Sequence, residues 1–312
     1  MKKIICLVTL YLLAPVAFTQ GPLSPSGAPG PTMKTLHQIE PRTPITNLPF
    51  IITQPGAYYL AANLTTTGFG ISVEADNVSI DLNGFAFSGP GPFTTSSGIL
   101  ICSTGVLQGI VIRNGTIRDF VIGINSCAVS HSLFESLSLY NVFSGIVLDS
   151  SNGSVSGNRV QSCQIRCAST SNGNGIIFNT GTGVVFGNQV HDNLIERGRF
   201  GIVFDGTASL INGNVVLRNQ VLDSSQNAIL MRGGYGRIED NHLFSNSASG
   251  FPTPPPGLVT TGSRNFVFNN TMSGSFFGYE ISTNDTSGPV VSSAGVLSNT
   301  GAAAHPRANF WR

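Results

Sequence analysis

Charged side chains are scarce in this chain of 312 residues. Only 10% of the positions are Asp, Glu, Lys or Arg, whereas a soluble domain usually has about 25%. This shortage excludes a coiled coil or a charged helical bundle, which would be rich in Ala, Glu, Lys and Leu. Intrinsic disorder is excluded as well, because 41% of the residues are hydrophobic and the formal net charge is only +1.

The chain also lacks a basic run. Lys34 is the only lysine after residue 20, and removal of Lys2 and Lys3 would leave 14 basic and 15 acidic residues. A nearly neutral chain has no electrostatic attraction for DNA or RNA and no polybasic membrane patch. We therefore expect no nucleic-acid partner.

Residues 1–20 have the pattern of a secretory signal peptide. Lys2 and Lys3 precede an apolar run over 4–14, and small or turn-forming residues follow up to Gln20. An uncleaved anchor is the alternative, but the run is short for a bilayer, which takes about 20 residues. We expect a secreted, extracellular or periplasmic protein with no membrane insertion after cleavage. Residues 21–44 are rich in Pro and Gly and are interpreted as a linker, with a short capping helix over 33–40.

From about Gly70 the chain repeats itself. A small residue followed by an aliphatic one returns after 22 to 30 residues, at Gly70-Ile71, Gly98-Ile99, Gly123-Ile124, Gly145-Ile146, Gly175-Ile176, Gly201-Ile202, Ala228-Ile229 and Gly257-Leu258. The segments alternate in polarity and favour β-branched residues, which is typical of strands, and no stretch between them has helical periodicity. Parallel strands without crossover helices indicate a solenoid whose turns stack about 4.8 Å apart.

A second apolar segment in most repeats leads to an asparagine. These residues are Asn83, Asn114, Asn158, Asn188, Asn214, Asn241 and Asn270. Asparagine tolerates the left-handed backbone of a bend, and amides stacked in register can bond to the turns above and below. We interpret this set as a structural asparagine ladder.

The stretch ITNLPFIITQPGAYYLAANLTTTGFGISVEADNVSIDLNGFAFSG (residues 45–89), with the later GI and GN repeats, resembles bacterial secreted proteins of the right-handed parallel β-helix class. This is the architecture of the pectate-lyase-like superfamily. The resemblance implies an all-β, right-handed parallel β-helix of about eight coils over residues 45–278, and we expect 279–312 to form an irregular tail that packs on it. It implies no activity, because many members of the group have no assigned function. A leucine-rich repeat is the alternative architecture, suggested only by the spacing in residues 133–141.

Four residues after each small residue, the repeat predicts an outward column near the strand end. Its members are Glu74, Cys102, Cys127, Asp149, Asn179, Asp205, Arg232 and Thr261. Asp149 and Asp205 would lie two turns apart, about 10 Å, close to the roughly 6.5–9.5 Å of an inverting glycosidase. Arg232 could bind a uronate carboxylate. These three residues are the candidate catalytic set; the alternative is a solvated edge that discourages lateral aggregation.

Asn179 and Glu74 belong to the same column, and Tyr235 lies near a repeat junction where an aromatic ring could stack on a sugar. We take these three as candidate substrate-binding residues. Cys102 and Cys127 occupy equivalent positions in successive turns, so a disulfide or a stacked free pair is expected. Cys163 and Cys167 could bridge locally or remain free.

No motif points to a metal or another cofactor. Polygalacturonase-like members of the fold carry Gly-His-Gly and Arg-x-Lys segments, which are missing here, and the segment 113–119 does not match the pectate-lyase pattern. Calcium binding usually needs several convergent oxygen ligands, and no such local cluster is present. We expect no cofactor, and calcium is the alternative, which no motif indicates.

The sequence therefore predicts a secreted β-helix that binds polysaccharide or cell-surface glycan, or serves a surface or structural role, without recognisable catalytic machinery. The alternative is a polysaccharide lyase or glycoside hydrolase that acts on uronate polymers, with Asp149 and Asp205 as acid and base. A further outward column is apolar: Ser72, Leu100, Asn125, Val147, Ile177, Val203, Leu230 and Val259. The tail or an insertion would cover it in a monomer, and a trimer is the alternative.

Overall fold

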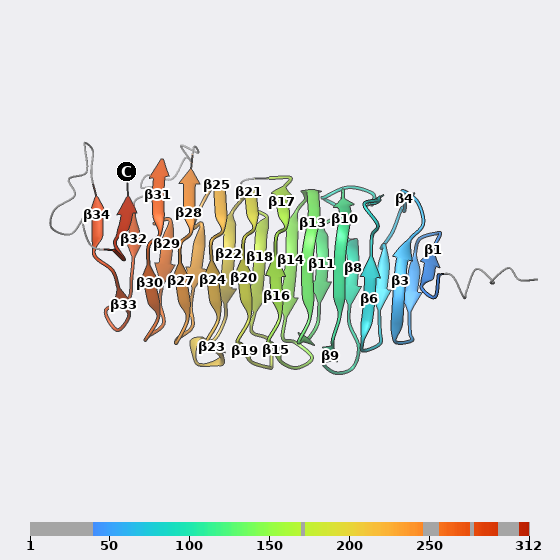
Figure 1. Cartoon of the computed structure of the whole chain (residues 1–312), viewed down its shortest axis with the longest axis horizontal. Coiled ribbons are helices and arrows are strands. Elements are labelled where there is room, and N and C mark those ends of the chain that lie inside the picture. The colour runs from blue at the N-terminus through green and yellow to red at the C-terminus, as the bar shows by residue number, and fades with distance from the viewer. Residues whose placement is uncertain (1–39, 170–171, 246–255, 275–277, 293–305, 312) are drawn as a thin grey trace, which may run out of the picture. The chain divides into compact units, whose positions relative to one another are not determined.

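Strands of sheets A and B return at every coil, and five coils add a short strand of a third sheet, sheet C; the strands pair in parallel. The computed structural model describes residues 40–169, 172–245, 256–274, 278–292 and 306–311. The predicted signal peptide, most of the linker and the predicted capping helix lie outside these residues. Figure 1 shows the strands lying side by side along one axis. No helix in the described ranges is long and apolar enough to cross a membrane.

Sheet B contains ten strands, one from each coil: β2 (Phe50–Ile52), β5 (Ile71–Val73), β8 (Ser97–Ile101), β11 (Ile122–Ser126), β14 (Ser144–Asp149), β18 (Asn174–Asn179), β22 (Phe200–Asp205), β26 (Ile229–Met231), β29 (Leu258–Thr260) and β32 (Tyr279–Glu280). Sheet C contains five short strands: β9 (Leu107–Gln108), β12 (Val129–Ser130), β15 (Val155–Ser156), β19 (Val185–Phe186) and β23 (Ile211–Asn212). The one helical element of the described residues is a 3-10 turn, η1 (Ala208–Leu210).

Sheet A collects the remaining twenty strands. They are β1 (Thr43–Ile45), β3 (Gly56–Leu60), β4 (Leu64–Thr65), β6 (Val78–Asp81), β7 (Ala86–Ser88), β10 (Val111–Arg118), β13 (Leu133–Val142), β16 (Arg159–Gln161), β17 (Gln164–Cys167), β20 (Gln189–His191), β21 (Leu194–Gly198), β24 (Val215–Leu217), β25 (Gln220–Ser224), β27 (Arg237–Glu239), β28 (His242–Ser245), β30 (Phe266–Phe268), β31 (Thr271–Gly274), β33 (Thr286–Ser287), β34 (Val290–Ser292) and β35 (Asn309–Trp311). Most coils contribute two strands to this sheet, separated by a corner. The chain is therefore the parallel β-helix that the repeat predicted.

The predicted inward columns are confirmed by the register. Ile146 pairs with Ile176, which pairs with Ile202, and all three are fully buried. In the neighbouring column the rings of Phe178 and Phe204 stack with centroids 4.5 Å apart. Equivalent side chains of successive coils thus form continuous strips of core, which fix the register because a slip of one residue would turn every apolar side chain outward.

The small residue of each repeat is explained by the close approach of the next coil. A Cβ atom at Gly145 would lie 2.4 Å from the carbonyl oxygen of Gly175, and one at Gly175 would lie 2.5 Å from that of Gly201. Such distances are shorter than a carbon–oxygen contact allows, so glycine lets the backbones pack closely. Ala228 fills the position in the seventh repeat and is fully buried.

The stack extends beyond the eight repeats at both ends. β1 already includes Thr43 and Pro44, which the sequence assigns to the linker, and β2 precedes the first repeat. At the other end, the described residues of 279–312 are not irregular: β32 extends sheet B, and β33 to β35 extend sheet A. The tail continues the coil because it supplies the same apolar and asparagine positions as the repeats.

The outward apolar column of sheet B is not a continuous exposed strip. Val203, Leu230 and Val259 are 1%, 5% and 7% exposed and form a second apolar cluster, against which Ile177 and Phe200 pack. Ser72, at the other end of the column, is also buried, at 7% exposed. That the tail or an insertion covers the column stays a prediction.

Candidate functional site

The predicted outward column exists and follows the end of the sheet B strands; we call it the rim column. Asp149 pairs with Asn179, and Asn179 pairs with Asp205. The backbone N–H of Arg232 donates to Phe204, and that of Cys127 donates to Ile101, as the same coil-to-coil stacking requires. Because neighbouring parallel strands are about 4.8 Å apart, the two carboxylates are separated by about 10 Å.

Neither Asp149 nor Asp205 is free of partners. Asp205 Oδ1 accepts a hydrogen bond from the N–H of Gly206 at 2.8 Å and forms an ion pair with Arg232 Nε at 2.9 Å. Asp149 Oδ1 accepts from the N–H of Ser151 at 2.7 Å. Arg232 is thus already paired with Asp205, so its guanidinium is not free to bind a uronate carboxylate.

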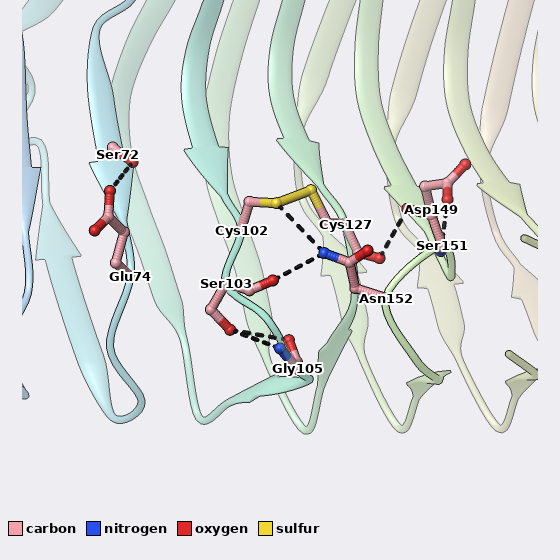
Figure 2. The surroundings of a disulfide bond; sticks show 9 residues. All are labelled: Ser72, Glu74, Cys102, Ser103, Gly105, Cys127, Asp149, Ser151 and Asn152. Atoms are coloured by element: carbon pink, nitrogen blue, oxygen red, sulfur yellow. Dashed lines mark hydrogen bonds between the residues drawn. A yellow bond between two sulfur atoms is a disulfide. The ribbon is translucent and has the colours of Figure 1, made fainter. Parts of the chain in front are cut away.

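The rim column is interrupted on its N-terminal side by a disulfide. Cys102 and Cys127 are bonded, with their Cα atoms 5.1 Å apart, which confirms the disulfide alternative for this pair. Figure 2 shows the bond crossing from one strand to the next, with Asn152 beside it donating to the carbonyl of Ser103. Covalent linkage of adjacent coils holds this part of the rim at a fixed spacing.

The other two predicted substrate-binding residues lie away from Asp149 and Asp205. Glu74 precedes the disulfide in the rim column, and its carboxylate accepts a hydrogen bond from Ser72 at 3.1 Å (Figure 2). Tyr235 is 56% exposed, but it lies at the corner before β27, where its hydroxyl contacts the guanidinium of Arg264. The structure therefore does not bring all the predicted site residues together.

The predicted asparagine ladder consists of two ladders. The first lies at the corner where a coil enters sheet A, and the second lies at the corner between the two sheet A strands of a coil. At the first corner Asn158 bonds to Asn188, which bonds to Asn214. At the second corner the side chains bond in the order Asn193, Asn219, Asn241, Asn270 and Asn309. The prediction of one ladder is wrong in joining Asn214 to Asn241, because the coil that contains Asn241 has Gly236 at the first corner, and the N–H of Gly236 donates to Asn265.

Asn83 and Asn114 belong to neither ladder. Their backbones are left-handed, with φ of 51° and 59°. The same conformation returns at the residue before each of the first four members of the second ladder, at Asp192, Arg218, Asp240 and Asn269. These two asparagines allow the backbone to bend, since Asn adopts the left-handed conformation readily.

Cys163 and Cys167 are both free and buried, which confirms the free alternative for this pair. Cys163 directly precedes strand β17, and Cys167 is its last residue. An extended chain places residues four apart at about 13 Å, which is too far for a disulfide. Burial raises the pKa of each thiol to about 12. Cys163 stands at the start of the second ladder: its N–H donates to Asn193, and its thiol donates to the carbonyl of Gln161.

Two surface hollows of about 240 Å³ each lie on the sheet A side, and neither is lined by the rim column. The first contains His131, Arg159 and Gln189. The second contains Asp192, Arg218 and Gln220. Sequence reasoning found neither, because each brings together corner residues from coils about 26 positions apart that share no motif.

The second hollow holds a paired cluster. Arg218 donates to both carboxylate oxygens of Asp192, at 2.8 and 2.9 Å, and His191 Nδ1 lies 2.7 Å from Asp192 Oδ2. The guanidinium, followed by the imidazole, lowers the pKa of Asp192 to about 2 despite some opposing desolvation. Asp192 therefore orients the side chains of Arg218 and His191 and is not itself available as an acid. Within the described residues, no group of three or more His, Cys, Asp or Glu side chains could hold a metal ion.

The fold and these side chains define a parallel β-helix with a polar rim and two polar hollows. No family model and no curated protein matches the chain. Among solved structures, it is similar to a mutant DFA-IIIase from Arthrobacter chlorophenolicus A6 in complex with DFA-III, with 13% identity and a TM-score of 0.49 over 76% of this chain. The alignment spans 60% of the DFA-IIIase chain. An alginate lyase from Paenibacillus sp. str. FPU-7 matches with 13% identity and a TM-score of 0.34, over 83% of this chain and 92% of its own.

Proposed function

We propose that the protein is exported and binds a polysaccharide along its coil axis without cleaving it. The observation that carries the proposal is the register of the rim column, which presents Asp149, Asn179 and Asp205 as equivalent polar positions on consecutive strands. A regular array at a fixed spacing suits a polymer whose own hydrogen-bonding groups recur along its length. The strands are preorganised by the core, so little ordering entropy is lost when the polymer binds.

The local contacts favour binding over catalysis. Inverting hydrolysis needs one carboxyl group that carries a proton and one that activates water. Asp205 is instead held by Arg232, whose Nε lies 2.9 Å from its Oδ1. Both partners are also nearly half exposed, at 43% and 48%, rather than enclosed in a water-excluding cleft.

The separation of Asp149 and Asp205 is the observation that favours the enzymatic alternative. Two strand spacings, about 10 Å, are near the upper end of the range for inverting glycosidases. In this alternative the protein is a polysaccharide lyase or glycoside hydrolase that acts on uronate polymers.

Retention on a glycan array, combined with assays for new reducing ends and for unsaturated products, tests the proposal on the purified protein. We expect retention by at least one polymer and no product. The double substitution Asp149→Ala and Asn179→Ala should weaken retention about tenfold, as loss of charged and neutral hydrogen bonds predicts. The control Glu196→Gln, on a sheet A strand, should leave retention unchanged.

Two outcomes would overturn the proposal. Product formation that is abolished by Asp205→Asn would establish the enzymatic alternative. The absence of both retention and product over the whole array would leave a structural or adhesive role without a glycan partner.

A further inference from the structure

The first surface hollow contains a guanidinium with no partner in the described parts of the chain. Arg159 begins strand β16 and is exposed, and its register neighbours on the adjacent coils are Leu133 and Gln189. No acidic side chain in the described ranges forms an ion pair with it. Two other arginines of the sheet A strands and corners differ in this respect: Arg218 is paired with Asp192, and Arg237 with Glu239.

The hollow exists because of the backbone at the corner between sheets C and A. His131 and Gly157 occupy equivalent places in successive coils and have φ of 50° and 63°. A Cβ atom at Gly157 would lie 3.1 Å from Cδ2 of His131, so the imidazole extends over the glycine. His131, Arg159 and Gln189 therefore border one concavity of about 240 Å³.

These three side chains suit a bound oxyanion. A guanidinium presents paired N–H donors that match a carboxylate or a sulfate group. The Gln189 amide and the His131 ring add donors from the adjacent coils, and the volume is adequate for an anionic substituent on a sugar ring. An uncharged ligand would leave the guanidinium without a counter-charge.

Aromatic side chains continue the same corner along the axis. Phe186 is 52% exposed and pairs in register with Ser156, the residue that precedes Gly157. Tyr235 lies two coils beyond Gly187, the residue that follows Phe186, and is 56% exposed. The guanidinium of Arg264 lies 5.4 Å from the centre of the Tyr235 ring. Exposed rings of this kind provide apolar faces for sugar rings, while the nearby guanidinium groups add positive charge.

We infer that this corner binds an acidic polysaccharide, with a carboxylate or sulfate group held in the hollow by Arg159. The inference rests on the proposed function, because it assumes a polysaccharide ligand, and it adds the charge of that ligand and a second contact surface. The polymer would run parallel to the axis, from the Arg159 hollow past Phe186 towards Tyr235.

Isothermal titration of the purified full chain tests the inference with four probes: oligogalacturonate, alginate oligosaccharide, dextran sulfate and neutral dextran. We expect at least one acidic probe to bind more tightly than dextran. The first two probes carry carboxylates and the third carries sulfates, so their comparison identifies the anion. Arg159→Gln should weaken binding of the acidic probe about tenfold, as expected for loss of a charged hydrogen-bonded contact.

Arg166→Gln is the matched control, because Arg166 is an exposed arginine of the same coil at the second strand of sheet A. It removes the same charge and should change the affinity less than twofold. Circular dichroism and a thermal melt verify that both variants fold. Rescue of binding by Arg159→Lys to an intermediate level would further assign the effect to the positive charge.

The outcomes separate this inference from the function on which it rests. Equal affinity for dextran and the acidic probes, or equal loss in Arg159→Gln and Arg166→Gln, would overturn the corner site while polysaccharide binding stands. Retention that depends on the rim column but not on Arg159 would do the same. Failure of every polymer to bind would overturn both.

Discussion

At the scale of single residues, asparagine has two different structural roles at the corners of sheet A. The left-handed position uses residues that tolerate positive φ, such as Asn114 and Asn269. The next position points inward and carries the ladder, as Asn219 and Asn270 do. Sequence alone finds the asparagines but not the division, because the two positions are adjacent and Asn suits both.

The second ladder should contribute measurably to stability. Asn219 is fully buried, accepts from the N–H and the amide of Asn193, and donates to Asn241 and two carbonyls. Asn219→Ala leaves several of these groups without partners in the interior, and we expect a loss of about 3 kcal/mol in the free energy of unfolding. Urea denaturation measures it. Asn125→Ala on the outer face of sheet B is the control, and an equal loss in both variants would contradict the account.

The pKa of Asp192 reports on its pairing. Arg218→Asn, which keeps a residue that tolerates left-handed backbone, should raise this pKa from about 2 towards the usual 3.8. A carboxyl whose pKa is lowered by folding stabilises the fold above pH 4 and loses that effect as the pH falls towards 2. Because the pair is exposed, we expect a contribution of only about 0.5 kcal/mol. Carboxyl NMR titration measures the pKa, and Arg237→Gln should leave it unchanged.

At the scale of elements, the strand positions were predictable because the period of the repeat and the alternation within it agree. The pairs from Gly70-Ile71 to Gly257-Leu258 all fall on sheet B in the expected register. The ends of the stack were not predictable, because β1 lies in a proline-rich segment and β32 has Tyr279 in place of the aliphatic residue after Gly278.

The close approach of the coils predicts a difference between two glycines. A Cβ atom at Gly175 would meet Ile195 at 2.4 Å and the carbonyl oxygen of Gly201 at 2.5 Å, whereas at Gly105 nothing lies within 4 Å. Gly175→Ala should therefore lower the free energy of unfolding by about 1–3 kcal/mol through overpacking. Gly105→Ala should change it by no more than about 0.5 kcal/mol. Thermal and urea unfolding compare the two, and equal stability would show that the coils are farther apart than described.

At the scale of the whole molecule, regular stacking decides which residues share a surface. It allowed the rim column and the adjacency of Cys102 and Cys127 to be predicted from spacing alone. The hollow at Arg159 could not be predicted in this way. It depends on a histidine ring that extends over Gly157 and on side-chain directions at a corner, which the repeat does not specify.

The register of adjacent coils is the central claim, and cysteine cross-linking across the rim column tests it most directly. Asn179 and Asp205 occupy neighbouring coils in the same relation as the bonded Cys102 and Cys127, whose Cα atoms are 5.1 Å apart. The pair Asn179→Cys and Asp205→Cys should form a disulfide on mild oxidation, as peptide mapping by mass spectrometry would show. Asp149→Cys with Asp205→Cys, two coils apart, should not. A cross-link in the second pair, or none in the first, would contradict the account.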